Sequence, residues 1–347
     1  MAGDDKRRGR VKCVVWDLDN TLWKGVLLEG DPTEVDNGVL DCIRRLDEVG
    51  VLHSIASKND EDTALAKLRE LGIEDLFLMP QINWNAKSHS VRRIAEGLRL
   101  GLDALAFVDD QDFERAEVAA GSPEVLCLDV TEIEEAMGWP EFMPRFFTGE
   151  SKRRRAMYRT QLVRDDEEAG FVGTSDEFLA TLDMTLVIGE AGPEDLLRAE
   201  ELTVRTNQLN ATGRTYSYEE LDMLRRSDDH LLLVAGLSDK FGSYGTIGLA
   251  LVETGTPDWH LRLLLMSCRV MSRGVGTVLL GHVMRLAGEA GRGLLADFVE
   301  TGRNRMMRIT YGFAGFEEER RDGIGVTLRA DPARSLPPPP YLRLDVG

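Results

Sequence analysis

The stretch KCVVWDLDNTLWKG, residues 12–25, decides how the first part of this chain folds. Its apolar residues ahead of Asp17 are typical of a buried strand, yet Asp17 and Asp19 follow directly. A carboxylate that is buried without a partner is strongly destabilising. We therefore expect both acids to lie at the end of a strand, where they face a cation, a ligand or solvent.

Apolar runs alternate with helical patterns from this stretch to about residue 130. The sequence predicts strands at CVVWDLD (13–19), VLHSIAS (51–57) and ALAFVDD (104–110), with a short one at DLFLMP (75–80). Near-continuous apolar strands that alternate with helices indicate a parallel sheet covered on both faces. In such sheets ligands bind outside the carboxyl ends of the strands.

Four separated segments place chemically active side chains at those strand ends or in the loops that follow. They contribute Asp17, Asp19 and Thr21 from the first, Ser57, Lys58 and Asn59 from the second, Lys87 from the third, and Asp109 and Asp110 from the fourth. Carboxylates suit Mg²⁺, which prefers oxygen ligands and recruits phosphate oxygens, and we assign as its ligands Asp17, Asp19, Asp109 and Asp110.

The same residues meet the requirements of phosphoryl transfer. Asp17 is placed to attack phosphorus as a nucleophile, and Asp19 to protonate the leaving oxygen and later activate water. Ser57 and Lys87 would hold and neutralise the phosphoryl oxygens. We expect the remaining polar groups at these strand ends to bind the substrate: Thr21, Lys58 and Asn59.

In order and spacing these motifs resemble the haloacid-dehalogenase (HAD) superfamily of aspartyl-phosphate phosphatases. D-x-D-x-T matches Asp17, Asp19 and Thr21, and the resemblance implies an HAD-like parallel-sheet domain that uses Mg²⁺. One departure is the segment D-D-Q-D, where relatives commonly have D-D-x-P, and it adds Asp112 near the expected metal. The first two motifs are too close together for a large cap domain, which predicts an open site or one covered by the second domain.

From about residue 171 the pattern changes to antiparallel strands followed by the segment MSRGVGTVLLGHVM (271–284). Glycines between a strand and a helix let the backbone approach a ligand, and the helix N-terminus offers N–H groups to a phosphate. With GRNRMMRITYGFAGF (302–316), this segment resembles the GNAT acyltransferase superfamily, an α+β fold. The resemblance implies that coenzyme A or a pantetheine arm is gripped by Arg269, Arg273, Gly274, Gly276 and Asn304.

Four cysteines without C-x-x-C spacing argue against a zinc site or disulfides. Cys268 lies just ahead of the glycine loop, where Arg269 and Arg273 would lower its pKa and make it an acyl-carrying thiol. Cys13, on the same strand face as Asp17, is the rival thiol. Either cysteine is also compatible with a purely structural position in a core.

The segment ELTVRTNQLNATGRTYSYEEL (201–221) is unusually polar for the interior of a domain. Its donors Arg205, Asn207 and Asn210 suit a small polyhydroxylated or phosphorylated acyl group, but they would equally cap a loop.

Taken together, KCVVWDLDNTLW, SIASKND, FVDDQDFERAEV, LTVRTNQLNATG and SCRV resemble the FkbH-like family, in which an HAD domain is fused to a GNAT-like one. This resemblance implies removal of phosphate from D-1,3-bisphosphoglycerate and loading of a glyceryl unit onto the phosphopantetheine thiol of an acyl carrier protein in polyketide-type biosynthesis. The domains expected are a phosphatase domain (10–147), a helical connector (148–171), a GNAT-like domain (172–330) and an extended tail (331–347).

The formal charge of −18, from 42 basic and 60 acidic residues, argues against a nucleic-acid partner. No apolar stretch is long enough to span a membrane, and the charged N-terminus does not resemble a signal peptide, so we expect a cytoplasmic protein. An acidic carrier protein would need a basic dock, for which the candidates are Lys152–Arg159 and the arginines 269, 273, 303 and 305. The alternative functions are a plain phosphatase whose second domain only binds, a non-catalytic adaptor, and acetyl transfer from coenzyme A.

Overall fold

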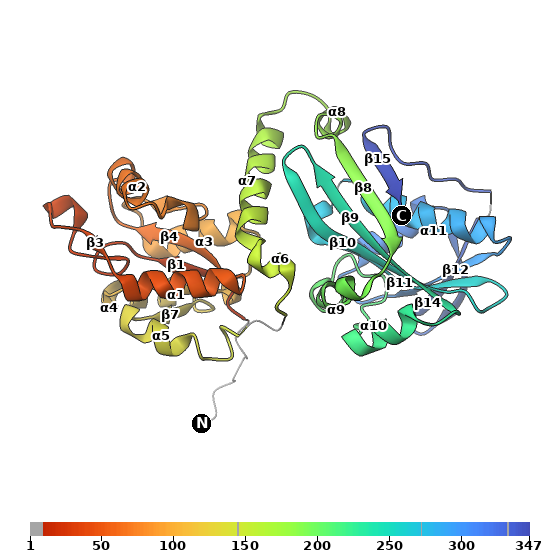
Figure 1. The fold of residues 1–347 in the computed structure, drawn as a ribbon, viewed down its shortest axis with the longest axis horizontal. Helices are drawn as coiled ribbons and strands as arrows, with labels where there is room; N and C mark the ends of the chain where they lie inside the picture. The colour runs from red at the N-terminus through yellow and green to blue at the C-terminus, as the bar shows by residue number, and fades with distance from the viewer. Residues whose placement is uncertain (1–9, 144–145, 272, 332) are drawn as a thin grey trace. The chain divides into compact units, whose positions relative to one another are not determined.

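The computed structural model describes residues 10–347 except 144–145, 272 and 332. The chain forms two compact units, which meet in sequence between Val163 and Arg164 (Figure 1). Most of the charged N-terminal segment, which we expect not to be a signal peptide, lies outside the described residues. None of the described helices is long and apolar enough to cross a membrane.

Unit 1 is built on a parallel sheet in the order β5-β4-β1-β6-β7. Its strands are β1 (Cys13–Trp16), β4 (Leu52–Ser57), β5 (Gln81–Ile82), β6 (Leu105–Val108) and β7 (Leu126–Leu128). The three main apolar runs therefore form neighbouring strands, as the sequence predicts. The prediction for residues 75–80 was wrong, because this segment contains a 3-10 turn and the short strand begins only at Gln81.

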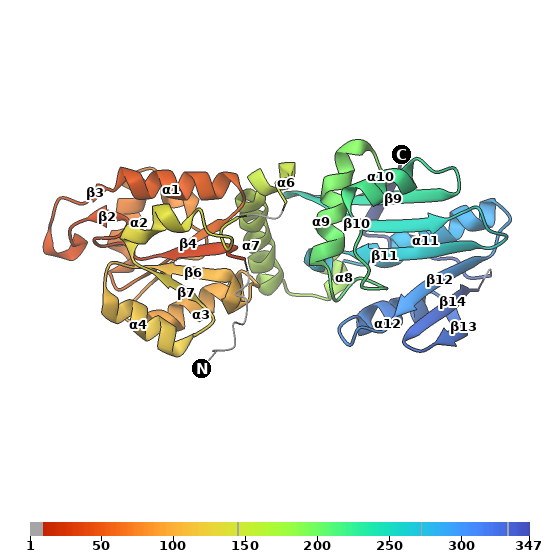
Figure 2. The ribbon, with the colours of Figure 1, turned by 90° about the horizontal axis from the view of Figure 1, so that it is seen from below.

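Helices cover both faces of this sheet, as the continuous apolar strands require. On one face α1 (Asn37–Glu48), α2 (Glu61–Glu70) and α5 (Ile133–Ala136) pack on Trp16 and Ile55. On the other, α3 (Lys87–Gly97) and α4 (Asp112–Gly121) pack on Val15 and Phe107 (Figure 2). Between β1 and α1 lies only a small hairpin, β2 (Trp23–Lys24) and β3 (Glu34–Val35), with a 3-10 turn between its strands.

The expected connector contains α6 (Gly149–Lys152) and α7 (Arg154–Gly170), and the boundary between the units falls within α7. Tyr158 and Leu162 pack on the core of unit 1. Within unit 2, the guanidinium of Arg164 donates to both carboxylate oxygens of Asp239, at 2.7 and 2.8 Å, and stacks 3.9 Å from the ring of Tyr244. The part of α7 before the boundary therefore packs on the core of unit 1, and Arg164 after the boundary pairs within unit 2.

Unit 2 is built on an eight-stranded sheet in the order β13-β14-β12-β11-β10-β9-β8-β15. Its strands are β8 (Met184–Glu190), β9 (His230–Asp239), β10 (Gly242–Glu253), β11 (Trp259–Met266), β12 (Leu294–Val299), β13 (Phe316–Asp322), β14 (Gly325–Ala330) and β15 (Leu342–Val346). The pairs β11–β12 and β15–β8 are parallel, and the others are antiparallel. The predicted fold class, a parallel α/β unit followed by an α+β unit, is confirmed.

Helices also cover both faces of the second sheet. On one face lie α8 (Ser175–Ala180), α11 (Val275–Glu289) and α12 (Arg305–Phe313), which share the larger core. On the other lie α9 (Leu196–Arg205) and α10 (Tyr218–Arg225).

The paired part of β11 and β12 is short, from Trp259 opposite Leu294 to Leu261 opposite Ala296. Beyond it, residues 209–211 bond to both strands. Ala211 donates its N–H to Leu264 and accepts from the N–H of Val299, and the carbonyl of Leu209 accepts from Met266. Residues 209–211, from the polar segment of the sequence, therefore bridge β11 and β12 where the two strands separate.

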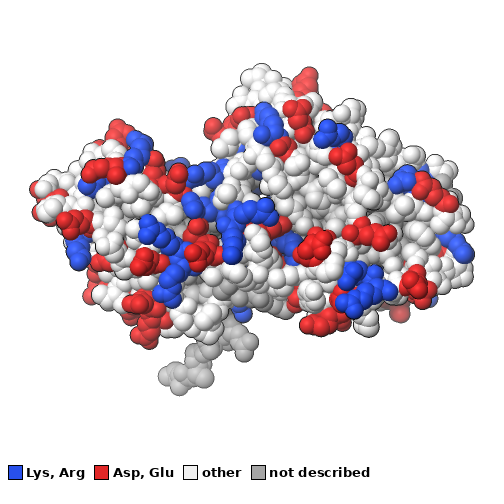
Figure 3. Space-filling model, in the orientation of Figure 1, with Lys and Arg blue, Asp and Glu red and all other residues white. Residues whose placement is uncertain are grey.

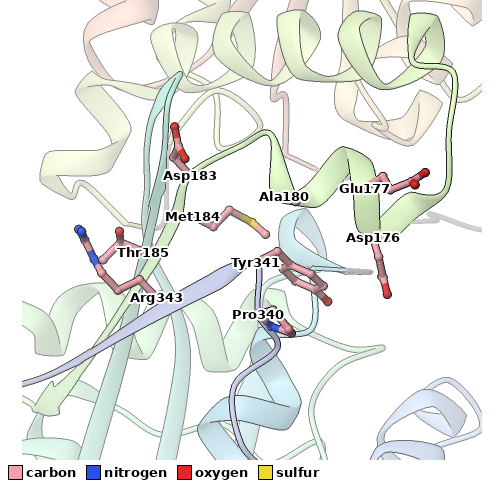
Figure 4. Close-up of a pocket in the computed structure, with 9 residues that line it drawn as sticks. All are labelled: Asp176, Glu177, Ala180, Asp183, Met184, Thr185, Pro340, Tyr341 and Arg343. Carbon is pink, nitrogen blue, oxygen red and sulfur yellow. The ribbon is translucent and has the colours of Figure 1, made fainter.

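Residues 331–347, expected to be an extended tail, contain the edge strand β15, which pairs with β8 from Leu342 opposite Met184 to Val346 opposite Ile188. The segment that leads into this strand lines a cavity of about 680 Å³ together with α8 and the start of β8. Figure 4 shows Tyr341 in the middle of its wall, with Asp176, Glu177 and Asp183 around it.

Candidate active site

Carboxylates from two neighbouring strands of unit 1 converge on one buried lysine. Asp17 directly follows β1, Asp109 directly follows β6, and Lys87 is the first residue of α3. The Nζ atom of Lys87 lies 2.9 Å from Oδ1 of Asp17 and 2.5 Å from Oδ2 of Asp109. With Asp110, the two aspartates form a cluster whose ligand atoms all lie within 4.8 Å of one another. Three of the predicted strand ends thus meet in space.

This cluster carries more buried negative charge than positive charge. Burial alone would lower the pKa of Lys87, but the carboxylates of Asp17 and Asp109 outweigh it and raise the pKa. Burial and the neighbouring Asp17 carboxylate raise the pKa of Asp109 to about 6, although Lys87 opposes them. Burial and Asp17 also raise the pKa of Asp110. One lysine therefore does not neutralise the three acids.

The donor set fits a divalent cation. All the clustered ligands are carboxylate oxygens, which hard cations such as Mg²⁺ prefer. Three carboxylates with one ammonium leave two negative charges, and Oδ1 of Asp17 is buried with an ion pair but without a well-directed hydrogen bond. A divalent cation would supply both the missing charge and the missing partner.

The structure does not bring the carboxylate of Asp19 into this cluster. Its Oδ1 accepts from the indole N–H of Trp23 at 2.8 Å and from the backbone N–H of Leu27 at 3.1 Å. Its Oδ2 accepts from the side-chain amide of Asn59 at 3.1 Å. These three donors hold the carboxylate in one orientation, so its predicted place among the metal ligands lacks geometric support, whereas its position two residues after Asp17 remains suited to proton transfer. Asn59, predicted to bind substrate, instead positions Asp19.

Two other predicted residues lie at the same edge of the sheet. The hydroxyl of Thr21 accepts from the backbone N–H of Asp110 at 3.1 Å, which links the first motif to the last. Ser57 is the last residue of β4 and is buried, and its backbone carbonyl accepts from the N–H of Asn83. Thr21 therefore orients Asp110, while Ser57 lies at the carboxyl end of β4 and its contact with a phosphoryl group stays a prediction.

Lys58 forms an ion pair that the sequence analysis did not foresee. Its Nζ lies 2.7 Å from Oε1 of Glu114 on α4, and the other oxygen of that buried carboxylate has no hydrogen-bond partner. Arg115 was also missed, and it donates to the backbone carbonyl of Asp109. Asp112, expected near the metal, is instead exposed and pairs with Arg115 outside the cluster. The Lys58–Glu114 pair joins residues 56 positions apart in the sequence, so no local pattern encodes it.

In unit 2, the predicted phosphate-binding loop around Gly274 lies between β11 and α11, as the sequence predicts. Its arginine, Arg273, forms an ion pair with Glu168. Gly274 adopts a φ of 74° at the start of α11, which favours glycine. Arg273 is buried, forms a 2.9 Å ion pair with Glu168 and lies over the ring of Phe178. A Cβ on Gly274 would lie 3.0 Å from the hydroxyl of Tyr341, so the C-terminal segment rests against this loop.

The other residues predicted to contact the cofactor have separate local surroundings. Gly276 follows in the first turn of α11, where a Cβ would approach Met266 at 3.4 Å. The backbone N–H and Nε of Arg269 both lie near the hydroxyl of Ser267.

Two predicted ligand-binding asparagines hold the backbone together. The amide of Asn304 is fully buried and donates to the carbonyls of Asn210, Ala211 and Val299. The side-chain oxygen of Asn210 accepts from the N–H groups of Thr212 and Gly213. Both side chains therefore hydrogen-bond to the backbone in and around the bridging segment 209–211, and their contact with a ligand stays a prediction.

The remaining two residues of that polar group lie near the surface. The Nε of Arg205 lies 3.2 Å from Oε1 of the buried Glu201, which makes it part of an ion pair on α9. Asn207 is exposed. The structure does not gather the predicted substrate-binding residues of unit 2 into one site.

The two candidate thiols differ in access. Cys13 is fully buried in the sheet of unit 1, and burial raises its pKa far above the usual range. Cys268 is exposed, at the start of a 3-10 turn after β11. Partial burial raises the pKa of Cys268 too, and no arginine lowers it, contrary to the expectation for Arg269 and Arg273. Of the two thiols, only Cys268 is open to a substrate.

The expected basic dock is partly neutralised. Arg155 pairs with Asp47 at 2.9 Å, Arg159 pairs with Asp75 at 2.9 Å, and Arg154 donates to the carbonyl of Gly50. Figure 3 shows acidic and basic side chains interspersed over the face that it presents. These arginines fasten α7 within unit 1 rather than forming a free basic surface.

Comparison with known proteins finds similarity to solved structures, each over less than half of this chain. No family model matches the chain, and no curated protein matches it. Among solved structures, the N-terminal part of the protein BF1531 from Bacteroides fragilis, which contains a phosphatase domain and is complexed with Mg, is 26% identical over 38% of this chain and 40% of its own length, with a TM-score of 0.33.

Two acetyltransferases show similarity over a comparable share of the chain. The ribosomal-protein-S18-alanine N-acetyltransferase from Escherichia coli is 16% identical over 42% of this chain and 90% of its own, with a TM-score of 0.33. The PaiA N-acetyltransferase from Thermoplasma acidophilum, in complex with coenzyme A, is 16% identical over 42% of this chain and 98% of its own length, with a TM-score of 0.31.

Proposed function

We propose that unit 1 is a Mg²⁺-dependent phosphatase that works through an aspartyl-phosphate. The observation that carries this proposal is the buried cluster of Asp17, Asp109 and Asp110 around Lys87, at the carboxyl ends of β1 and β6. A buried pair of one acid and one base is neutral, whereas this cluster retains two negative charges and so calls for a cation.

The reaction begins when a carboxylate oxygen of Asp17 attacks phosphorus. The new bond forms as the bond from phosphorus to the leaving oxygen breaks, and Asp19 delivers a proton to that oxygen. Asp19 then removes a proton from water, which attacks the phosphorus of the aspartyl-phosphate. The bond to Asp17 breaks, and inorganic phosphate leaves.

Other residues bind and orient the reacting groups. Lys87 and Ser57 neutralise and hold phosphoryl oxygens, and the donors on Asp19 keep its carboxylate aimed for both proton transfers. The Mg²⁺ would be held by Asp17, Asp109 and Asp110, and it would offset the charge of the phosphoryl group during transfer.

For the whole chain, we propose glyceryl transfer coupled to this phosphatase. The substrate would be D-1,3-bisphosphoglycerate, and the acceptor the phosphopantetheine thiol of an acyl carrier protein. The thiolate of Cys268 attacks the acyl-phosphate carbon, the carbon–oxygen bond to phosphate breaks, and phosphate leaves with the bonding electrons. The carrier thiolate then attacks the thioester and displaces Cys268, while unit 1 removes the second phosphate. The exposure of Cys268 supports this assignment.

A second candidate is a phosphatase for another small phosphorylated or carrier-bound substrate, whose unit 2 only binds. The raised pKa of Cys268 and the engagement of Arg273 with Glu168 favour it, because neither activates a thiol.

Phosphate release tests the first proposal. The full chain is incubated with p-nitrophenyl phosphate and Mg²⁺ beside Asp17→Asn and, as a matched control, Asp41→Asn on the exposed face of α1. We expect Asp17→Asn to lose at least about a thousandfold in kcat, since the nucleophile is gone, and the control to keep wild-type activity. Wild-type turnover in Asp17→Asn would contradict the proposal.

Intact-protein mass spectrometry tests the transfer. Enzyme, Mg²⁺, D-1,3-bisphosphoglycerate and a holo-carrier protein are mixed, with Cys268→Ala and the half-buried control Cys127→Ala in parallel. A glyceryl mass on the carrier that disappears only in Cys268→Ala is expected. Phosphate release with no acyl mass on enzyme or carrier would exclude the transferase and leave the second candidate.

A further inference from the structure

We propose that unit 2 holds a second binding site, specific for a small anionic molecule, in a cavity of about 400 Å³ beside the end of β12 and the β13–β14 hairpin. The cavity is lined by side chains from β11, β12, the β13–β14 hairpin and the loop after α9, and its charged members are Arg214, Arg262, Arg320, Asp297 and Asp322. A volume of this size suits a small metabolite.

The cavity exists because of two local features of the sheet. β11 and β12 stop pairing after Leu261 and Ala296, and the bridging segment 209–211 closes that parting from one side. On β14, Gly325 stands opposite Val299 and carries no side chain to fill the space. The bridging segment also delivers the next residues, Thr212 and Arg214, to the cavity wall. The polar motif around residue 210 thus builds the site without its asparagines touching a ligand.

Part of the cavity wall is held in place by a network of ion pairs. Arg262 donates to Glu253 at 2.6 and 2.8 Å and to Asp297 at 3.1 Å. The second oxygen of Asp297 lies 2.7 Å from Nε2 of His260. The network joins one guanidinium to two carboxylates and a histidine, so it fixes the shape of the wall and leaves no unpaired positive charge to offer a ligand.

The remaining charges are two arginines and one acid. The guanidinium of Arg214 lies 4.7 Å from the ring centre of the buried Tyr216, which orients it without neutralising it. Among the described residues, neither Arg214 nor Arg320 has a carboxylate partner. Asp322 is the opposing charge outside that network. In a chain of net charge −18, two unpaired guanidinium groups at one cavity favour a carboxylate or phosphate ester, which they can bind through paired hydrogen bonds.

The test is calorimetric titration of the full chain in metal-free buffer, so that the phosphatase site of unit 1 has no cation with which to bind phosphate. The probes are D-glycerate, sn-glycerol 3-phosphate and, as the neutral control, glycerol. We expect at least one anion to bind, glycerol not to bind, and the affinity to fall as salt is added. The stronger of the two anions identifies the ligand as a carboxylate or a phosphate ester.

Three variants locate the site. Arg214→Gln and Arg320→Gln should each weaken binding about tenfold, the loss expected for one charge-assisted contact of about 1.4 kcal/mol. Asp322→Asn should strengthen binding, because it removes the opposing charge. Arg292→Gln, which changes an exposed arginine outside the cavity lining, is the control and should leave the affinity unchanged.

The proposal is overturned if neither anion binds, or if anion binding is unaffected by Arg214→Gln, Arg320→Gln and Asp322→Asn together. It is also overturned if Asp17→Asn abolishes the binding, since the anion would then be in unit 1. This site is independent of the proposed phosphatase, so either can fail without the other.

Discussion

Single side chains in unit 1 act mainly by holding other side chains in place. Asp19 is oriented by Trp23, Leu27 and Asn59, Asp110 by Thr21, and Lys58 by Glu114. A carboxylate that must donate and then accept a proton gains from such preorganisation, because less reorganisation remains to be done during the reaction.

The Lys58–Glu114 pair gives the first prediction. Glu114→Gln removes the charge that holds the Lys58 ammonium, so the KM for a phosphorylated substrate should rise about threefold to tenfold while kcat changes less than about twofold, the pattern of lost ground-state binding. Steady-state kinetics measure both constants. The matched control is Glu70→Gln, which removes the exposed Lys67–Glu70 pair and should change neither. A fall in kcat with KM unchanged would assign Glu114 to the chemical step instead.

His53 gives a prediction about pH. It is fully buried on β4, where its Nδ1 accepts from the indole N–H of Trp16, and burial lowers its pKa from 6.5 to about 3. The unfolded chain therefore binds the proton first, and the stability from this neutral histidine is complete above pH 6.5 and declines as the pH falls toward 3.

From pH 7 to pH 5 this residue should cost unit 1 about 2 kcal/mol of unfolding free energy, at about 1.4 kcal/mol per pH unit. His53→Asn keeps an acceptor for Trp16 but cannot titrate, so its stability should depend less steeply on pH. Urea unfolding followed at several pH values measures both slopes, and parallel slopes for the two proteins would refute the assignment.

At the scale of elements, the last part of α7 is fixed to the β9–β10 hairpin by one buried ion pair. Arg164 and Asp239 are nearly inaccessible, and Asp239 also accepts from the hydroxyl of Tyr244 at 2.9 Å. Arg164→Met should destabilise unit 2 by about 3 kcal/mol, because it leaves a buried carboxylate unpaired. Adding Asp239→Asn should restore part of that loss. Denaturant midpoints test this, and equal losses in the single and double variants would show that only packing is involved.

Elements also show what could be predicted from the sequence. The strands of unit 1 followed from continuous apolar runs, and the convergence of Asp17, Lys87 and Asp109 followed from the rule that parallel strands end at one edge. The β13–β14 hairpin was missed, because EEERRD on an edge strand carries no apolar alternation.

Predictions about residues failed where the partner is distant in sequence. Asn304 looked like a ligand donor, and only the separation of β11 and β12 shows that its amide satisfies backbone carbonyls there. Arg273 lies beside the glycine loop, as predicted, but nothing in the neighbouring sequence indicates that it forms an ion pair with Glu168.

For the whole molecule, the two units have separate cores and should respond separately to a ligand. Mg²⁺ at about 100 times its Kd should stabilise unit 1 by about 2.7 kcal/mol and leave unit 2 unchanged. Hydrogen exchange resolved by peptide assigns the protection to one unit. Asp109→Asn should abolish the effect, and added protection that is confined to unit 2 would contradict the metal assignment.

The pairing of β15 with β8 has a consequence for how the protein is made. These neighbours come from opposite ends of the sequence of unit 2, so β8 leaves the ribosome long before its partner exists. Until residue 346 emerges, one side of β8 presents unpaired N–H and C=O groups, and a nascent chain is open to mispairing there. Completion of the second sheet must therefore wait until β15 has been synthesised, and interruption of translation shortly before β15 should yield chains that associate through this exposed strand.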